Sequence, residues 1–362
     1  MSTARKLKML APCYRLISYG ALKISDREKQ LVNEVLDSNQ LSYGDYTRKF
    51  ERQIASIHNA KYGLFMNSGT SALHVALATL KELHGWEDGD EVICPSVTFI
   101  ATSNIVLHNN LTPVFADVER ESFNINPKEI EKKITSKTKA IIPVHLLGLP
   151  CDMDPIIDLA KKHGLKILED TCECMYAKYK DKFVGTLGDI GCFSTYAAKL
   201  IVTGVGGVAV TNNQDYAVSM RSIMNHGRNN IYIESLENGA STEEEKKEII
   251  EKRFLFESVG HSFRCTEMEA AIGLGQLERL DEIVTRRREI AKQLTDGLAP
   301  LQDYLQLPSC PKDRTYTYMA YGVALKNEEK SNLVNFLEEH NIETREMLPL
   351  LNQPVYRKKF GD

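Results

Sequence analysis

Between residues 25 and 211 the sequence alternates short β-rich runs with segments of helical periodicity, and this alternation restricts the possible folds most strongly. Two of the helical segments, 71–85 and 153–164, carry apolar residues at helical spacing and end at a glycine. Strands that alternate with helices form βαβ units, so we expect an α/β fold with a largely parallel sheet covered on both faces. The expected strands are 62–67, 91–95, 113–117, 140–147, 165–170, 190–196 and 206–211.

The second part of the chain has a different character. Residues 241–253 are strongly charged, and 266–294 have the apolar spacing of one long helix or of two consecutive helices. A strand at 317–325 and a helix at 331–345 are expected to build a smaller α+β lobe. The sequence therefore suggests an N-terminal arm (1–24), a large domain (25–240) and a C-terminal part (241–362) that holds the long helix and the small domain.

Composition excludes several classes of protein. The 362 residues are 43% hydrophobic and 26% charged, as in ordinary globular proteins, and the formal net charge of −4 argues against nucleic-acid binding. No apolar run reaches the roughly 20 residues that span a bilayer, and residues 1–20 lack the apolar core of a signal peptide. The eight cysteines follow no framework spacing, and Cys172 and Cys174 have no partner cluster at zinc spacing. We expect a cytoplasmic protein without a metal site.

Chemistry is expected where strands end, because ligands bind at the carboxyl edge of parallel sheets. The turn "NSGTSAL" (67–73) follows a strand and opens a helix, whose N-terminus attracts anions. The strand "LKILED" delivers Asp170, and Lys199 is a lone charge in the segment "CFSTYAAKLIVTGVGGVAV" (192–210). Each feature alone is compatible with a structural role: the turn as a helix cap, Asp170 as a capping or salt-bridged residue, and Lys199 as a surface residue.

Together, the three features are the parts that hold pyridoxal 5′-phosphate. The lysine forms a Schiff base with the cofactor, the acid keeps the ring nitrogen protonated, and the helix N-terminus takes the phosphate. Partial burial is expected to lower the pKa of Lys199 and so free its amine for exchange and proton transfer.

At these residues the chain resembles the DegT/DnrJ/EryC1/StrS family of sugar aminotransferases, which are fold-type I pyridoxal-phosphate enzymes. The resemblance extends from about Ile24 to Tyr356 and includes "NSGTSAL", "PSVTFIATSN", "PVFADVE", "EDTCE", the Lys199 segment and "MEAAIGLGQLERLD". It implies a large domain with a mostly parallel seven-stranded sheet between helices and a smaller α+β C-terminal domain.

The resemblance also implies roles for single residues. Lys199 and Asp170 would be catalytic and would bind the cofactor. The further cofactor-binding positions would be Gly69, Thr70 and Ser194 at the phosphate, Phe99 stacked on the ring, Glu173 near the phenolic oxygen, and Ser262. Packing in the core at a helix start is the alternative for Phe99.

Three positions depart from the family pattern. Thr195 replaces an aromatic residue, Val205 replaces an acid, and Ser262 replaces an asparagine that commonly reaches the phosphate of the neighbouring subunit. The resemblance implies a homodimer with shared active sites, to which the loop 226–230 and the segment 260–264 would contribute.

The reaction implied is transfer of an amino group from glutamate to a keto sugar, a nucleotide-linked 4-keto-6-deoxyhexose, in glycan biosynthesis. Three alternatives stay open. One is transamination of a small phosphorylated ketone or a cyclitol ketone. Another is the family's 3-dehydratase branch, which carries histidine at the position of Lys199. The third is a non-catalytic regulator that binds pyridoxal phosphate.

Overall fold

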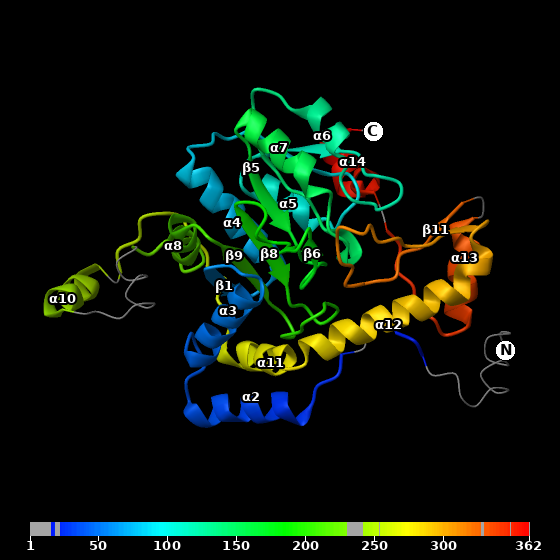
Figure 1. Cartoon of the computed structure of the whole chain (residues 1–362). Coiled ribbons are helices and arrows are strands. Elements are labelled where there is room, and N and C mark those ends of the chain that lie inside the picture. Colours follow the sequence, from blue (N-terminus) through cyan, green and yellow to red (C-terminus); the bar gives the residue numbers. More distant parts are fainter. Residues whose placement is uncertain are drawn as a thin grey trace.

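A seven-stranded sheet forms the centre of the protein in the computed structural model, which describes residues 16–18, 22–229, 242–252, 254–326, 329–347 and 349–361 (Figure 1). Its strands lie in the order β1-β9-β8-β5-β4-β2-β3. The five strands from β8 to β3 in this order pair in parallel. β9 runs antiparallel to both of its neighbours, β8 and β1. The bounds are β1 Tyr62–Met66, β2 Glu91–Pro95, β3 Thr112–Ala116, β4 Thr138–Ile141, β5 Lys166–Asp170, β8 Ile190–Ser194 and β9 Gly207–Thr211.

The seven strands lie where the sequence predicts them, with one substantial difference. β4 ends at Ile141, whereas the apolar pattern predicts a strand that continues to residue 147. Pro143 has no N–H group with which to continue a ladder. Beyond it the chain turns through a short 3₁₀ segment, Leu146–Gly148, in which Leu147 adopts a left-handed conformation with φ 57°.

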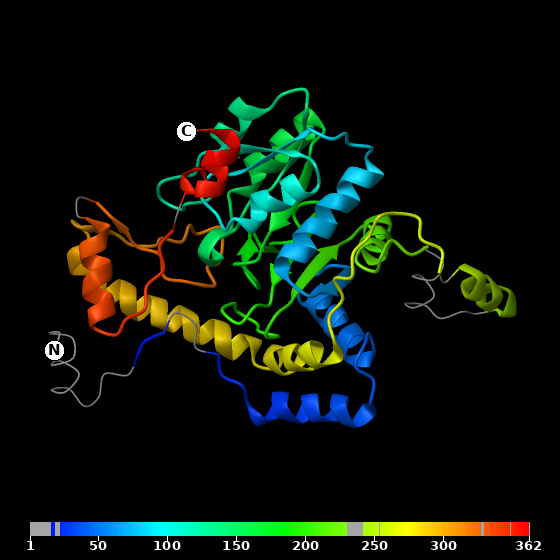
Figure 2. The ribbon, with the colours of Figure 1, turned by 180° about the vertical axis from the view of Figure 1, so that it is seen from behind.

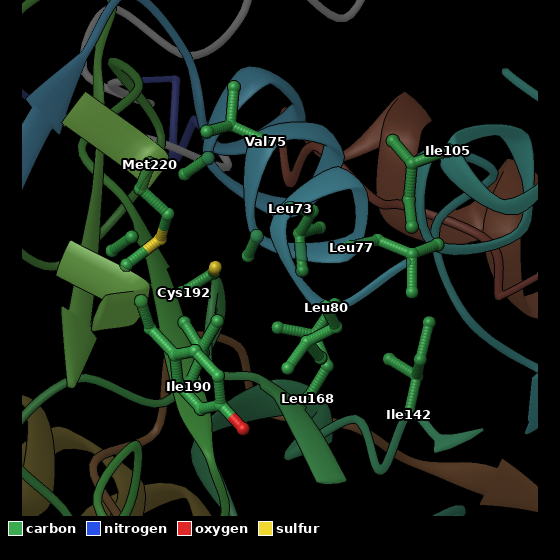
Figure 3. Close-up of a cluster of buried hydrophobic side chains, with 14 of the residues drawn as sticks. Leu73, Val75, Leu77, Leu80, Ile105, Ile142, Leu168, Ile190, Cys192 and Met220 are labelled. Atoms are coloured by element: carbon green, nitrogen blue, oxygen red, sulfur yellow. The ribbon is translucent and has the colours of Figure 1, made fainter. Parts of the chain in front are cut away.

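Alternation along the strands separates two apolar layers. Val92, Leu168 and Cys192 face one layer, whereas their neighbours Ile93, Ile167 and Phe193 face the opposite one. The first layer is covered by α4 (Gly69–Leu83), α5 (Ala101–His108) and α8 (Gln214–Ile223). Figure 3 shows Leu73, Leu77 and Leu80 of α4 packed towards strand residues such as Leu168 and Ile190.

The opposite face is covered in two parts. One part consists of α2 (Asp26–Ser38), α3 (Asp45–Ile57) and α11 (Glu267–Leu277), which pack around Phe50, Ile54, Phe193 and Leu274. The other contains α6 (Pro127–Lys133) and α7 (Met153–His163), which cover the strands β2 to β5. The sheet is therefore covered by helices on both faces, as the βαβ pattern predicts.

The C-terminal lobe is reached through α12 (Leu280–Leu298), which continues from α11 after a break at Glu278–Arg279. The region 266–294 thus forms two helices, one of the two predicted arrangements. The lobe contains β10 (Leu305–Gln306), β11 (Ala324–Leu325) and α13 (Lys330–Glu339). Figure 1 shows α12 running from α11 beneath the sheet out to α13, and α10 (Glu243–Lys252) standing beyond α8.

Two predictions for this lobe are wrong in extent. Only Ala324–Leu325 of the predicted strand 317–325 is a strand, because backbone groups of residues 316–319 bond instead to the 147–148 turn and to arginines of α12. The predicted helix 331–345 stops at Glu339, since Asn341 adopts φ 61° and Glu343 bonds to Ile17.

The last helix, α14 (Pro354–Phe360), returns to the large lobe beside α5, as Figure 2 shows from behind. Its Tyr356 is buried, and the phenol donates to Asn104 Oδ1 at 2.7 Å. A two-stranded β6–β7 hairpin (Lys178–Tyr179, Lys182–Phe183) completes the fold. Much of the predicted arm 1–24 and the predicted boundary near residue 240 lie outside the described residues, so the three-part division stays a proposal.

Candidate active site

The candidate site lies where β5, β8 and β1 end at one edge of the sheet. Asp170 is the last residue of β5 and is paired in parallel register with Cys192 of β8, two residues before Ser194. β1 ends at Met66, and three residues later Gly69 begins α4. The topology therefore brings together positions that are up to about 125 residues apart in sequence.

Asp170 is buried and accepts two hydrogen bonds. Thr102 Oγ1 donates to its Oδ2 at 2.8 Å, and the Cys172 backbone N–H donates to its Oδ1 at 3.1 Å. Burial raises the pKa of the carboxyl above its ordinary value, and these two hydrogen bonds oppose that shift without cancelling it. A buried carboxylate of this kind favours a cationic partner, such as a protonated ring nitrogen.

The turn before α4 is built for close approach. Ser68 caps the helix by accepting from the Ser71 N–H at 3.0 Å. A Cβ on Gly69 would lie 2.8 Å from Ser194 Cβ and 2.9 Å from Cys172 Sγ, so only glycine fits between them. The N–H groups of the first turn, with exposed Thr70 among them, form an anion site at the positive end of a 15-residue helix.

Gly207 brings β9 against this turn from the other side. A Cβ there would collide with the backbone of Ser68 and Gly69. Gly207 in the glycine-rich segment after Lys199 thus allows β9 to pass the Ser68–Gly69 turn at backbone contact.

Lys199 lies on a loop that is closed at its base by two threonines. Thr195 Oγ1 and Thr203 Oγ1 are 2.7 Å apart, and the Thr203 N–H donates to Thr195 O at 2.8 Å. Thr195, where the family commonly has an aromatic residue, therefore bonds within its own loop and is fully buried. Val205, the other departure in this segment, is about half exposed.

The Lys199 amine contacts a carboxylate. Its Nζ lies 3.3 Å from Glu173 Oε1, and both side chains are mostly buried, at 17% and 15% exposed. The Leu147 N–H donates to the other carboxylate oxygen of Glu173 at 3.0 Å. The prediction of a lowered lysine pKa is wrong for this arrangement. Burial by itself lowers the pKa of Lys199, but the charges around it, led by Glu173, raise it above its ordinary value overall.

Phe99 precedes α5 and is 68% exposed, which excludes the alternative of core packing. Its carbonyl accepts from the Thr102 N–H at 3.2 Å, so the same turn presents the phenyl ring and holds Asp170 through the Thr102 hydroxyl. An exposed aromatic ring on the turn that also carries Thr102 is available to stack on a planar ligand.

Ser262 lies on a segment that runs beside the end of β1. The Asn67 N–H donates to Phe263 O at 2.8 Å, directly before the phosphate turn, and Arg264 Nη2 donates to Ser262 Oγ at 3.1 Å. A groove of about 820 Å³ extends from Thr70 along α4 and past His261. Thr70 and Ser71 of the first turn of α4 are among its lining residues, and Lys199 is not. Of the loop 226–230, Asn230 lies outside the described residues.

The structure therefore gathers most of the predicted residues into one site. Gly69 packs against Ser194 and Cys172. The Cys172 N–H donates to Asp170, and the Lys199 amine donates to Glu173. Ser262 lies on the neighbouring segment, and its contact with the phosphate turn stays a prediction.

Sequence reasoning missed Thr102, Leu147 and Met319, whose sulfur lies 3.4 Å from Lys199 Nζ. Thr102 carries a weak signal, since it is a small polar residue one helical turn after the aromatic of "VTFIAT". The other two carry none.

These residues fit pyridoxal 5′-phosphate. The close approach at Gly69, the buried carboxylate, the exposed phenyl ring and the amine are the groups that would hold the phosphate, pair with the ring nitrogen, stack on the ring and anchor the cofactor covalently. Fold and site together define a fold-type I pyridoxal-phosphate enzyme.

Comparison with known proteins agrees. Residues 22–362 match the DegT/DnrJ/EryC1/StrS aminotransferase family, and the chain belongs to that family. It is 37% identical to a GDP-perosamine synthase from Escherichia coli O157:H7 over 93% of this chain and 86% of that protein. Its structure is similar to that of S. venezuelae DesV in complex with a ketimine intermediate, with a TM-score of 0.80, 29% identity and coverage of 92% and 83% of the two chains.

A second solved structure is similar to a comparable degree. This is the E. coli GDP-4-keto-6-deoxy-D-mannose-3-dehydratase with bound hydrated PLP, with a TM-score of 0.85, 27% identity and coverage of 96% and 90% of the two chains. The protein is a PLP-dependent aminotransferase by family, and its cofactor is pyridoxal 5′-phosphate. None of its described helices is both long and apolar enough to cross a bilayer.

Proposed function

We propose that this protein transfers the amino group of glutamate to a nucleotide-linked 4-keto-6-deoxyhexose, as a step in the biosynthesis of surface polysaccharide or another glycan. The observation that carries the proposal is the Lys199 amine held by Glu173 in the same site as the buried Asp170. The names of the relatives, GDP-perosamine synthase and GDP-4-keto-6-deoxy-D-mannose-3-dehydratase, support a sugar linked to a nucleotide and make GDP the first nucleotide to test.

Each residue has a distinct task in this reaction. Pyridoxal phosphate supplies an electron sink when it is bound. Asp170 holds a positive charge at the ring nitrogen, the first turn of α4 binds the phosphate, and Phe99 covers the ring and excludes water. Lys199 anchors the cofactor and, once its amine is free, moves a proton to or from the carbon that loses or gains the amino group. Glu173 holds that amine in place.

The 3-dehydratase alternative is weakened by one residue. That branch carries histidine at the position where this chain has Lys199, and the lysine lies inside the site within 3.3 Å of Glu173. Transamination of a small phosphorylated or cyclitol ketone would use the same residues, so only a substrate panel separates it from the sugar reaction. A non-catalytic regulator would use the same three features to bind the cofactor, so turnover of a keto substrate with glutamate separates the enzyme from it.

We also propose that the active unit is a homodimer in which the segment 260–264 of each chain contributes to the partner's site. The contribution to the partner's site is what the resemblance to the family implies. Within its own chain the segment is bonded to Asn67, next to the turn at Gly69, and it carries Arg264, whose positive charge would attract a phosphate. Light scattering should give about twice the chain mass of 40.8 kDa. A fully active monomer would contradict both the dimer and the shared site.

The cytoplasmic location is supported by the described cysteines, all of which are free thiols.

The test begins with the cofactor. Protein loaded with pyridoxal phosphate is reduced with borohydride and digested, and the peptide that contains Lys199 should carry the label, whereas Lys199→Ala should take up none. Label on another lysine would refute the assignment. Loaded wild-type protein should then aminate GDP- and dTDP-linked 4-keto-6-deoxyhexoses with glutamate. Turnover only of phosphorylated or cyclitol ketones would replace the sugar by that alternative, and loss of the C3 hydroxyl without net amination would establish the dehydratase.

A further inference from the structure

The catalytic amine has a second neighbour, which comes from the C-terminal part of the chain. Lys199 Nζ lies 3.4 Å from the sulfur of Met319, and Met319 is buried. The amine is therefore bordered by a carboxylate, Glu173, and by a thioether, which is apolar and a weak hydrogen-bond acceptor. The immediate surroundings of the amine thus combine one polar and one apolar neighbour.

A single residue of the large lobe, Leu147, positions both neighbours through its own N–H and carbonyl groups. The Leu147 N–H donates to Glu173 Oε2 at 3.0 Å, and the Leu147 carbonyl accepts from the Met319 N–H at 2.8 Å. The next residue, Gly148, accepts from the Thr317 N–H at 3.1 Å. A Cβ on Gly148 would lie 2.9 Å from Tyr318 N, so glycine is required for the two segments to meet.

The long helix α12 fixes the Met319 segment from the opposite side. Arg287 Nη1 donates to the carbonyls of Tyr318 and Met319 at 3.1 and 2.9 Å, and Arg288 Nε donates to Tyr316 O at 3.1 Å. The rings of Tyr316 and Tyr318 stack at 3.9 Å. The backbone of residue 319 is thus held on two sides, which defines where its side chain points.

We propose that Met319 forms the apolar side of the sugar subsite and receives the C6 methyl group of a 6-deoxyhexose, so that it selects 6-deoxy sugars over sugars with a 6-hydroxyl. This inference rests on the proposed function and adds a specificity residue to it.

The size of the substrate makes this contact possible. Lys199 exchanges a proton with the carbon that receives the amino group, so that carbon must come within about 3–3.5 Å of the amine. In a 4-keto-6-deoxyhexose the methyl carbon is two bonds from the keto carbon, within reach of a sulfur that itself lies 3.4 Å from the amine. The carbon on the other side of the ketone carries a hydroxyl, which suits the side of Glu173.

The selectivity follows from desolvation. A methyl group gains contact with the thioether, whereas a hydroxymethyl group would bury its hydroxyl against a side chain that offers no donor and only a weak acceptor. Apolar pockets discriminate against an added hydroxyl by up to about 100-fold, so we expect a preference for the methyl sugar of about 10- to 100-fold in kcat/KM.

The experiment compares two 4-keto sugars that carry the same nucleotide and differ only in a methyl or a hydroxymethyl group at C5. The ratio of their kcat/KM values is measured with glutamate for the wild type, Met319→Leu and Met319→Gln, all loaded with pyridoxal phosphate. Leucine keeps the apolar side, so the ratio should stay within about threefold of wild type. Glutamine has a similar size and offers an amide, so the ratio should fall by about tenfold or more. The ratio separates selectivity from any general loss of activity.

A second measurement does not depend on turnover. The protein is labelled with [methyl-¹³C]methionine, and the Met319 methyl signal is the one of ten that Met319→Leu lacks. The 4-amino-6-deoxy product should shift this signal, and its 6-hydroxy counterpart should shift it less at equal saturation. Equal kcat/KM for both sugars, a wild-type ratio in Met319→Gln, or product binding that leaves the Met319 signal unmoved would overturn the inference while the proposed function stands. If neither sugar is aminated although glutamate reacts, the proposed function fails and the inference fails with it.

Discussion

Thr102 and Asp170 are 68 residues apart in sequence, and the threonine hydroxyl donates to the carboxylate at 2.8 Å, with both side chains buried. Because the backbone of the same helical turn presents Phe99, the orientation of the acid and the position of the aromatic ring are set together. The carboxyl group is thus oriented before a cationic ring binds, and its burial costs desolvation free energy.

Replacement of Asp170 by asparagine should remove catalysis while it keeps the shape of the site. Without the charge the ring nitrogen loses its proton, and kcat should fall by a factor of about 10² to 10⁴, or roughly 3–5 kcal/mol in activation free energy. Thr102→Val is the matched control, because it removes one hydrogen-bond donor and leaves the charge of Asp170. It should raise the activation free energy by only roughly 1–2 kcal/mol. Near-normal steady-state turnover of Asp170→Asn would show that the charge of Asp170 is not needed for catalysis and that its role is structural.

The same variant should stabilise the cofactor-free protein. Burial raises the pKa of Asp170 in the folded state, so the folded protein binds this proton more tightly than the unfolded chain does. The resulting destabilisation develops as the pH rises from the ordinary pKa of 3.8 to the raised one, and it persists above that. Urea unfolding at pH 7 should show Asp170→Asn to be more stable than wild type, and the difference should shrink at acidic pH. A variant less stable than wild type at pH 7 would contradict this balance.

Replacement of Glu173 by glutamine should lower the pKa of Lys199. Burial favours the neutral amine, and Glu173 is the largest opposing influence, so its removal leaves burial in control. The pKa is measurable in cofactor-free protein from the pH dependence of Lys199 labelling by an amine reagent, with peptide mapping. In the wild type the raised pKa lets the Lys199 ammonium stabilise the folded protein below the ordinary pKa of 10.5, and that stability is lost as the pH rises from there through the folded pKa. In the variant, burial places the folded pKa below the unfolded one, so this loss should be absent and stability should instead rise with pH between the two pKa values. An unchanged labelling profile would show that Glu173 does not govern the amine.

His58 should make the fold sensitive to acid. It is fully buried, its Nδ1–H donates to Ile54 O at 2.9 Å, and its Nε2 accepts from the Tyr176 N–H at 3.3 Å, so the neutral ring is required. Burial lowers its pKa from 6.5 to about 4. The unfolded chain therefore takes up a proton that the folded protein does not, and stability is lost as the pH falls from about 6.5 towards 4.

In His58→Gln, which keeps a donor and an acceptor, the loss of unfolding free energy between pH 7 and pH 5 should be smaller by about 2 kcal/mol. The remaining buried histidines are common to both proteins and cancel in this comparison. Equal losses in chemical denaturation would refute the assignment.

A methyl group on Gly207 should damage the phosphate turn. The Cβ of Gly207→Ala would collide with the backbone of Ser68 and Gly69, so the turn must shift, at a cost of about 1–3 kcal/mol and with weaker retention of pyridoxal phosphate. Gly297→Ala is the control, since nothing lies within 4 Å of its Cβ position inside α12, and it should add about 1 kcal/mol of stability. Thermal unfolding and dialysis of the loaded proteins measure both effects. Full cofactor retention by Gly207→Ala would contradict the close approach.

The sequence by itself determined the elements of the sheet and the residues that make the site chemically recognisable. Apolar runs of four to eight residues between helical segments predict strands because each strand buries both of its faces, and the seven strands are found where these runs lie. The turn at Gly69, the acid at the end of β5 and the lysine before the glycines were visible because each stands next to a strand end, where the local pattern fixes its place.

Only the tertiary structure decided how these residues are tuned. The turn at the left-handed Leu147 and the irregular segment around Met319 are joined by hydrogen bonds between residues about 170 positions apart, which no local periodicity records. The pKa of Lys199 likewise follows from the distance to Glu173, since electrostatic energy depends on separation and burial in space and not on residue type. Local pattern selects which groups are present at the edge of the sheet, and long-range packing sets the distances on which their chemistry depends.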